Sequence, residues 1–121
     1  LDRYHSCYVA EVDGETAGCG GLEYITHEPL GQHHPEYRRL EERAWFVHPK
    51  YVGKKVGRRI YERLLEDAIK TGEEYLYVQA ANFPGTAGFK GTIDVYKELG
   101  FVEHAAPWFD GNHPVMRKRL R

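Results

Sequence analysis

The sequence predicts an α/β fold of the α+β type: a mixed, mostly antiparallel sheet with a central parallel strand pair and helices on its faces. Three observations lead to this expectation. Segments rich in β-forming residues stand at both ends of the chain, a long stretch between them has helical periodicity, and a shorter helical stretch follows one further strand. Strand–helix–strand units favour parallel neighbours, whereas directly connected strands form antiparallel hairpins. The 121 residues show no internal repeat or linker, so we expect one domain, 1–121.

The first half of the chain predicts three strands. Residues 5–12 and 15–26 are separated by Asp13-Gly14, a two-residue hairpin turn. The second of these strands contains three glycines, which predict a bulge or a close approach by another backbone. After a polar loop over 27–39, residues 40–48 (LEERAWFVH) predict the third strand, which Pro49 ends.

The second half alternates helices and strands. Apolar residues between positions 54 and 70 recur along one helical stripe, and Gly72 is a plausible left-handed cap. A strand over 74–82 and a glycine-rich loop over 83–91 follow. Thr92 and Gly100 are placed to cap a short helix, after which 101–104 and 114–120 predict two closing strands.

The two cysteines, Cys7 and Cys19, are expected to be free. With the Asp13-Gly14 turn, Cys7 would be opposite Gly20, and the alternation of side chains would place the two thiols on opposite faces of the hairpin. Free thiols are typical of a reducing compartment, so we expect a cytoplasmic protein.

Composition excludes several classes of function. The formal net charge is −1, which argues against general nucleic-acid binding, and no apolar stretch is long enough to span a bilayer or to form a signal peptide. The spacing of the histidines, including the adjacent His33 and His34, does not suit a metal site, so we expect no metal. Any anion site must therefore be local.

The stretch HPKYVGKKVGRRI, residues 48–60, predicts such a local anion site. It leads from a strand into the long helix, and the first N–H groups of a helix have no partner within it. These groups and the helix dipole bind anions, phosphates above all, while Gly53 and Gly57 let the backbone approach a ligand. The alternative is a solvated basic first turn, but four cations at a helix start oppose the dipole unless an anion compensates.

From AWFVHPKYVGKKVGRRIYERLLEDA through VYKELGF, the chain resembles the GNAT N-acetyltransferase superfamily. The family pattern at the turn, Arg/Gln-x-x-Gly-x-Gly/Ala, is matched with Val52 in place of Arg/Gln and Lys55 in place of a glycine. The resemblance implies that acetyl-CoA is the co-substrate and that the turn binds its pyrophosphate. The implied cofactor-binding residues at the turn are Val52, Gly53, Lys54, Lys55, Val56, Gly57 and Arg58.

The resemblance also implies roles outside the turn. Tyr96 in VYKELGF stands where the family has the tyrosine that protonates the departing CoA thiolate, a step that needs a donor within hydrogen-bond reach. The backbone of Phe46 and Val47 would bind the acetyl carbonyl and pantetheine. Asn82 is placed to contact the cofactor arm, although it lies 14 positions before Tyr96, about twice the usual gap, so another residue could take that role.

Acetyl transfer also needs a group that accepts the amine's proton. Glu41 is the closest match by position to a glutamate that several family members use, Glu23 is the reserve, and bound water is a third option. Side-chain alternation would place Glu41 on one face with Arg43, Trp45 and Val47.

Two functions follow from the resemblance. The first is direct attack of a primary amine, from a small molecule or a peptide, on the acetyl-CoA thioester in a ternary complex. The second is a catalytically silent module that binds acyl-CoA or a partner protein. The resemblance begins at the family's second strand. The wall of the acceptor site that the family's first strand and helices form would therefore come from residues before Leu1 or from the partner subunit of a homodimer.

Overall fold

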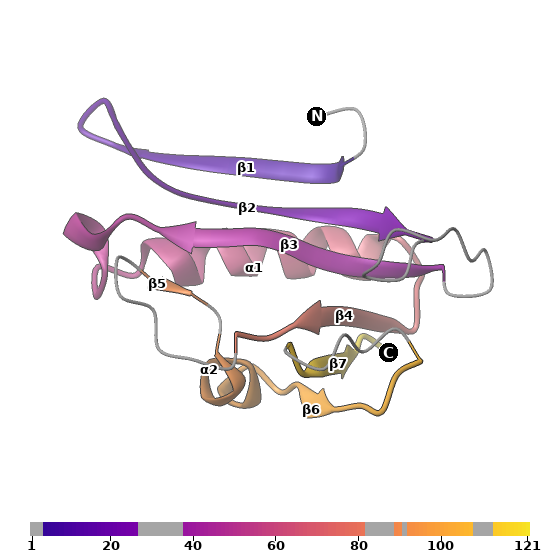
Figure 1. Cartoon of the computed structure of the whole chain (residues 1–121). Coiled ribbons are helices and arrows are strands. Elements are labelled where there is room, and N and C mark those ends of the chain that lie inside the picture. The colour runs from indigo at the N-terminus through magenta and orange to yellow at the C-terminus, as the bar shows by residue number, and fades with distance from the viewer. Residues whose placement is uncertain (1–3, 27–37, 82–88, 91, 108–112) are drawn as a thin grey trace.

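The computed structural model describes residues 4–26, 38–81, 89–90, 92–107 and 113–121. The strands are β1 (Tyr4–Val12), β2 (Glu15–Ile25), β3 (Arg39–Val47), β4 (Tyr75–Gln79), β5 (Phe89–Lys90), β6 (Val102–Glu103) and β7 (Val115–Arg119). The helices are α1 (Val56–Lys70), α2 (Ile93–Glu98) and a 3-10 turn, Pro49–Tyr51 (Figure 1).

The strands form one sheet in the order β1-β2-β3-β4-β7-β6, with β5 paired to β3 outside this path. The pair β3–β4 is parallel and the other pairs of named strands are antiparallel, so the predicted mixed sheet with a central parallel pair is confirmed. The register between β3 and β4 contains a single residue pair, Glu41 and Tyr77. Beyond it the two strands part, as Figure 1 shows, and β5 lies along β3 instead.

The hairpin turn is confirmed, but the predicted register along the hairpin is wrong. Val12 pairs with Glu15 as expected, but a shift between Ala10 and Glu11 moves the pairs from Ala10 to Ser6 by one residue, and a second shift between Ser6 and Tyr4 restores the predicted register. Val9 is therefore opposite Cys19, which places Cys19 on the same face as Cys7 instead of the opposite one. Both thiols are free, as expected.

A bulge in β3 changes which side chains face the helices. Ala44 has a φ of 58°, and two residues of β3, Ala44 and Trp45, are opposite the single residue Gly20 of β2. Before the bulge the even-numbered residues, Leu40 and Glu42, face the helical side, and after it the odd-numbered Trp45 does so. The predicted grouping of Glu41 with Trp45 and Val47 is therefore wrong, because the extra residue reverses the alternation.

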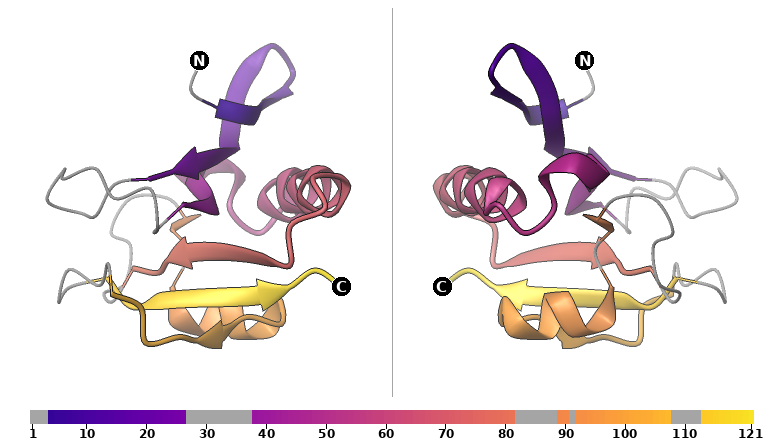
Figure 2. Two further views of the ribbon diagram at one scale, coloured as in Figure 1. Left: turned by 90° about the vertical axis from the view of Figure 1, so that its right-hand side faces the viewer. Right: turned by 90° about the vertical axis from the view of Figure 1, so that its left-hand side faces the viewer.

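Both helices pack into one hydrophobic core against the sheet. Tyr61 of α1 and Tyr96 of α2 lie next to each other, with ring centroids 6.3 Å apart, and both contact Trp45 of β3. Figure 2 shows α1 alongside β2 and β3, and α2 next to β6 and β7. The predicted close approach of another backbone to the second strand occurs at Gly18, where a Cβ would be 2.7 Å from the Phe46 carbonyl oxygen. At Gly20 the neighbours are side chains of α1, since a Cβ there would be 2.9 Å from Ile60 and 3.1 Å from Leu64.

The helix ends agree with the sequence signals. Gly72 and Gly100 have φ values of 82° and 93°, the left-handed conformation expected of C-terminal caps. Thr92 occupies the N-cap position of α2 as predicted, but its side chain makes no capping hydrogen bond.

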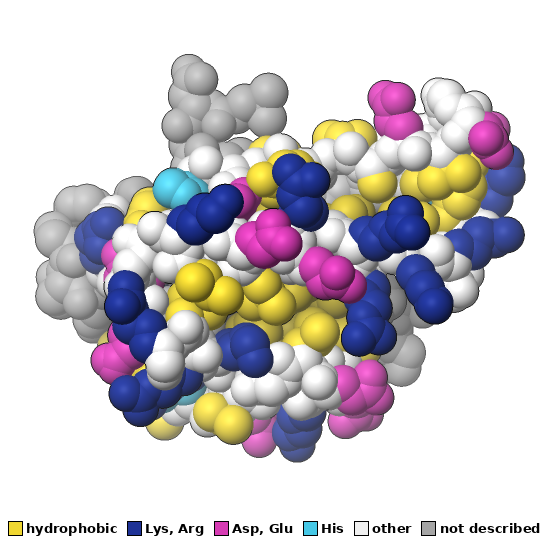
Figure 3. All heavy atoms as spheres, turned by 180° about the vertical axis from the view of Figure 1, so that it is seen from behind, with side chains coloured by type: hydrophobic (Ala, Val, Ile, Leu, Met, Phe, Trp, Pro, Cys, Tyr) yellow, Lys and Arg dark blue, Asp and Glu magenta, His cyan; other side chains and the backbone are white. Residues whose placement is uncertain are grey.

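The face that carries α1 presents a band of apolar side chains bordered by charged ones (Figure 3). Partly buried leucines from α1, α2 and the C-terminal end pack against the core, among them Leu65, Leu99 and Leu120. Within the described residues, none of the helices has the length and apolar character needed to cross a membrane.

Candidate functional site

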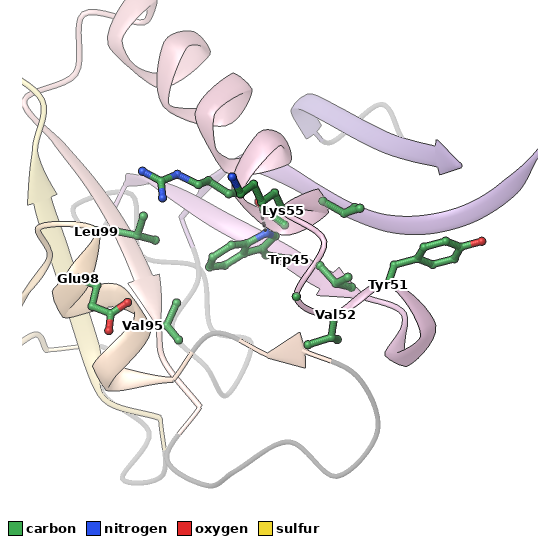
Figure 4. A pocket seen from close by; sticks show the side chains of 12 residues that line it. Trp45, Tyr51, Val52, Lys55, Val95, Glu98 and Leu99 are labelled. Atoms are coloured by element: carbon green, nitrogen blue, oxygen red, sulfur yellow. Dashed lines mark hydrogen bonds between the residues drawn. The ribbon is translucent and has the colours of Figure 1, made fainter. Parts of the chain in front are cut away.

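A pocket of about 500 Å³ lies between the start of α1 and α2. Trp45 and Val47 of β3 form its base, the turn that leads into α1 forms one wall, and α2 contributes the opposite wall through Val95, Glu98 and Leu99. Figure 4 shows the Trp45 indole directly beneath the start of α1, with the three α2 side chains across from it. The pocket contains most of the turn residues that the sequence singles out: Val52, Gly53, Lys55, Val56, Gly57 and Arg58.

The backbone at this turn leaves the start of α1 open. Gly53 has a φ of 83° and Lys55, the N-cap residue, has a φ of 66° with no side-chain cap. The first hydrogen bond of α1 runs from the Arg59 N–H to the Lys55 carbonyl, 3.1 Å. The N–H groups of residues 56–58 precede that bond, so they are available to a ligand at the helix start.

The charge around the turn is strongly positive. Lys54, Lys55, Arg58 and Arg59 are all exposed, and the first turn of α1 contains no acidic residue. Arg58 makes one ion pair along the helix, 3.6 Å from Glu62. Four cations at a helix N-terminus oppose the helix dipole, so an anion bound there would relieve an unfavourable arrangement. Glu98, across the pocket, is the one acidic side chain in the pocket lining among the described residues.

Gly57 has a packing role in addition to the predicted one. A Cβ at this position would be 2.9 Å from a methyl carbon of Val47, so glycine lets α1 approach β3 closely. Trp45 fixes the same contact, because its indole Nε1 donates a hydrogen bond to the Gly57 carbonyl at 3.2 Å. The pocket base and the helix start are therefore held together by two adjacent interactions.

Tyr96 lies behind the pocket, next to a carboxyl group that the sequence did not single out. Its hydroxyl donates a hydrogen bond to Glu42 Oε1, with an O–O distance of 2.6 Å. Tyr96 is only 3% exposed and Glu42 only 4%. Burial, together with the negative charge of Glu42, raises the pKa of Tyr96 well above its ordinary value, and burial raises the pKa of Glu42 to about 7.

Aromatic rings surround this pair. The Tyr96 ring lies 5.8 Å from that of Trp45 and 5.2 Å from that of Phe101. Tyr61 is buried on the same side, and its hydroxyl approaches the Glu42 carboxyl without the geometry of a hydrogen bond. Trp45 thus connects the pocket to the Tyr96–Glu42 pair, since it lines the pocket and its ring contacts that of Tyr96.

Glu41 lies on the opposite face of β3 from Tyr96. Arg39 Nε donates to Glu41 Oε2 at 2.8 Å, both side chains are buried, and Arg43 lies 3.9 Å from the other carboxylate oxygen. Burial raises the pKa of Glu41 more strongly than the two arginines lower it. Glu23 is opposite Glu41 on β2. Glu41 and Tyr96 therefore come from opposite faces at the place where β3 and β4 part.

The backbone predicted to bind the acetyl carbonyl and pantetheine has a partner in this structure. Phe46 pairs with Lys90, and Val47 pairs with Phe89, as β5 lies antiparallel to the end of β3. A ligand that used this edge of β3 would have to displace β5. Asn82 lies outside the described residues.

The described residues contain no group of three potential metal ligands. His33 and His34 lie outside the described residues. His48 accepts a hydrogen bond from the Lys50 N–H at Nδ1 and caps the 3-10 turn.

Sequence reasoning missed the role of Glu42 because it expected a bulge or a close backbone approach in the second strand and strict alternation in the third. Strict alternation gave Glu42 no role, and a non-glycine residue with positive φ, such as Ala44, has no sequence signature. Gly20 opposite the bulge was the available signal, since glycines within a strand often mark such irregularities.

Comparison with known proteins gives one family. The model of the acetyltransferase (GNAT) family matches residues 1–101 of the chain. No curated protein sequence is similar enough to count as a match.

Solved structures with the same fold include three of different activity. The GphF GNAT-like decarboxylase in complex with isobutyryl-CoA has a TM-score of 0.72 and 16% identity, with 97% of this chain and 79% of that chain covered. The ribosomal-protein-S18-alanine N-acetyltransferase from Escherichia coli has a TM-score of 0.68 and 20% identity, with 99% of this chain and 71% of that chain covered. The N-acetylglutamate synthase from Neisseria gonorrhoeae complexed with coenzyme A and L-arginine has a TM-score of 0.70 and 18% identity, with 95% of this chain and 24% of that chain covered. At these identities the similarity concerns the fold, and the chain spans about a quarter of the synthase.

Proposed function

Because the chain belongs to the acetyltransferase (GNAT) family, we propose that it transfers an acetyl group from acetyl-CoA to a primary amine by direct attack in a ternary complex. The observation that supports this most strongly is the helix start at the mouth of the pocket. Open N–H groups, the helix dipole and four exposed cations converge there, and a pyrophosphate is the kind of anion that such an arrangement binds. In this proposal residues 53–58 bind the pyrophosphate.

In this proposal the two predicted catalytic residues serve the two sides of the reaction. Tyr96 would give a proton to the departing thiolate, and Glu41 would accept a proton from the attacking amine. The positions of Tyr96 and Glu41 support these roles, because the two side chains lie on opposite faces of the sheet near the point where β3 and β4 separate. The raised pKa of Glu41 favours a base that works near neutral pH.

The acceptor is proposed as an amine of a small molecule or of a peptide. Solved structures with this fold include a ribosomal-protein-S18-alanine N-acetyltransferase and an N-acetylglutamate synthase, two enzymes named for different acceptors. A cytoplasmic location and a homodimer that completes the acceptor site belong to the same proposal.

Charge reversal at Arg58 is expected to weaken acetyl-CoA binding about tenfold, because one charge-assisted contact to the pyrophosphate becomes a repulsion. Calorimetric titration of Arg58→Glu against the wild type measures this. Lys70→Glu is the matched control: it changes the same charge at the far end of α1, roughly 18 Å along the helix axis, where salt screens the interaction. Equal binding by the Arg58→Glu variant and the wild type would contradict a pyrophosphate site at this turn.

A catalytically silent acyl-CoA-binding module is the second candidate, and two observations favour it. β5 occupies the edge of β3 that the reaction would use, and the proton of Tyr96 is already donated to Glu42. Release of free CoA in the presence of a panel of amines separates the two candidates. The enzyme releases CoA in proportion to the amine consumed, whereas the silent module binds acetyl-CoA and leaves it intact.

A further inference from the structure

We propose that Glu42 is a positioning residue that holds the Tyr96 hydroxyl and returns a proton to it during turnover. This inference rests on the proposed acetyl transfer. It is built on the short hydrogen bond between two buried groups, the Tyr96 hydroxyl and Glu42 Oε1, 2.6 Å apart. Burial of both groups restricts their access to solvent protons, so each is the other's nearest source or acceptor of a proton.

The protonation state of Glu42 decides what Tyr96 can do. When Glu42 is ionised it accepts the single phenolic proton, and Tyr96 has none left to donate elsewhere. When Glu42 is protonated, its O–H donates to the phenolic oxygen, and the Tyr96 O–H is free to point at a leaving group. Only the protonated state therefore makes Tyr96 a proton donor.

The proton balance of the step is simple. As the bond between the acetyl carbon and sulfur breaks, the thiolate takes the Tyr96 proton, and Tyr96 takes the Glu42 proton. The products at the site are a thiol, a neutral phenol and a Glu42 carboxylate. A proton from solvent then restores Glu42 before the next turnover, while the proton lost by the amine leaves by the opposite face.

The groups around Glu42 favour this exchange near neutral pH. Burial raises its pKa to about 7, the hydrogen bond from Tyr96 lowers it, and Glu41 on the same strand raises it. Tyr61 of α1 and Arg43 of β3 also act on the carboxyl, and both lower its pKa. At pH 7 the protonated and ionised forms are therefore present in similar amounts, which is the condition under which a relay group is most effective.

The pH dependence of turnover in Glu42→Gln tests the inference. Glutamine keeps the size and a hydrogen-bond acceptor but does not titrate. The turnover of the wild type and that of the variant are measured with the same amine, so the effect of amine protonation cancels in their ratio. With Glu42 titrating near 7, the ratio is expected to fall about tenfold between pH 6 and pH 8. Glu66→Gln removes an exposed carboxyl of α1, and its ratio is expected to stay constant.

Other results would overturn the inference or the function on which it rests. A wild-type to Glu42→Gln ratio that is constant from pH 6 to pH 8 overturns the role of Glu42. Bound acetyl-CoA without CoA release at any pH overturns the proposed transfer instead. In that case the inference is tested by infrared titration of the Glu42 carboxyl. A carboxyl signal that titrates near pH 7 in the wild type and is missing in Glu42→Gln supports the pairing with Tyr96. A Glu42 that is ionised down to pH 5 overturns the inference.

Discussion

Replacing Tyr96 by phenylalanine is expected to lower turnover about a hundredfold and to leave acetyl-CoA binding nearly unchanged. General acid catalysis by a positioned side chain contributes on the order of 10² to 10⁴ in rate, and the substitution removes the only proton that Tyr96 can give. Binding should be preserved because Tyr96 lies behind Trp45 and does not line the pocket. Steady-state turnover and calorimetric titration of the same preparation separate the two effects.

Tyr61→Phe is the matched control for Tyr96→Phe. It removes a second buried phenolic hydroxyl from the same cluster, one that has no hydrogen-bond partner among the described residues. Loss of an unsatisfied buried hydroxyl should be neutral or slightly stabilising, and turnover should stay within a few-fold of the wild type. Equal turnover by Tyr96→Phe and Tyr61→Phe would contradict the assignment of Tyr96 as the acid.

Replacing Arg39 by methionine is expected to lower the free energy of unfolding by about 3 kcal/mol at neutral pH. Arg39 and Glu41 form a buried ion pair at 2.8 Å, and removal of one partner leaves a buried carboxylate with much weaker compensation. Denaturant unfolding measures the change. Arg38→Met is the matched control, since Arg38 is 53% exposed and its ion pair with Glu73 lies at the surface, so its loss should cost well under 1 kcal/mol.

The destabilisation by Arg39→Met should depend on pH. The pKa of Glu41 is already raised in the folded protein, so its ionisation destabilises the fold as pH rises through that pKa. Without Arg39 the pKa of Glu41 rises further. The difference in free energy of unfolding between the wild type and Arg39→Met should therefore be largest at neutral pH, and it should shrink as the pH falls below the range in which Glu41 is ionised. A deficit of the same size at pH 4.5 and pH 7.5 would show that Arg39 acts through packing alone.

Prediction from the sequence succeeded where local signals are strong. The Asp13-Gly14 hairpin, the apolar stripe of α1 and the left-handed glycines at positions 72 and 100 each follow from a short pattern with one physical cause. The central parallel pair also follows from element order, because a strand–helix–strand unit favours it.

Prediction failed where the structure depends on an irregularity of one residue. The register shift in the first hairpin moved Cys19 to the face of Cys7, and the bulge at Ala44 placed Glu42, not Glu41, on the face of Trp45. A period-two pattern contains no information about either irregularity. The pairing of Tyr96 with Glu42 was missed for this reason.

The departure at Lys55 from the family pattern has a structural consequence. Lys55 adopts a φ of 66° at the N-cap of α1, a conformation that costs a non-glycine residue about 1 kcal/mol and a glycine almost nothing. The family pattern has glycine here, so this chain accepts local strain and gains a cation beside the open N–H groups. The lysine thereby adds positive charge that Val52, in place of the family's arginine or glutamine, does not supply.

The most direct test of a phosphate-binding helix start is an amide nuclear magnetic resonance titration of the protein with acetyl-CoA. If the account is correct, the backbone amides of Gly57 and Arg58 shift most strongly, because their N–H groups bind the pyrophosphate. The same titration with Arg58→Glu should need about ten times more ligand. Saturable shifts confined to another part of the chain, or no shifts at millimolar acetyl-CoA, would contradict the central claim.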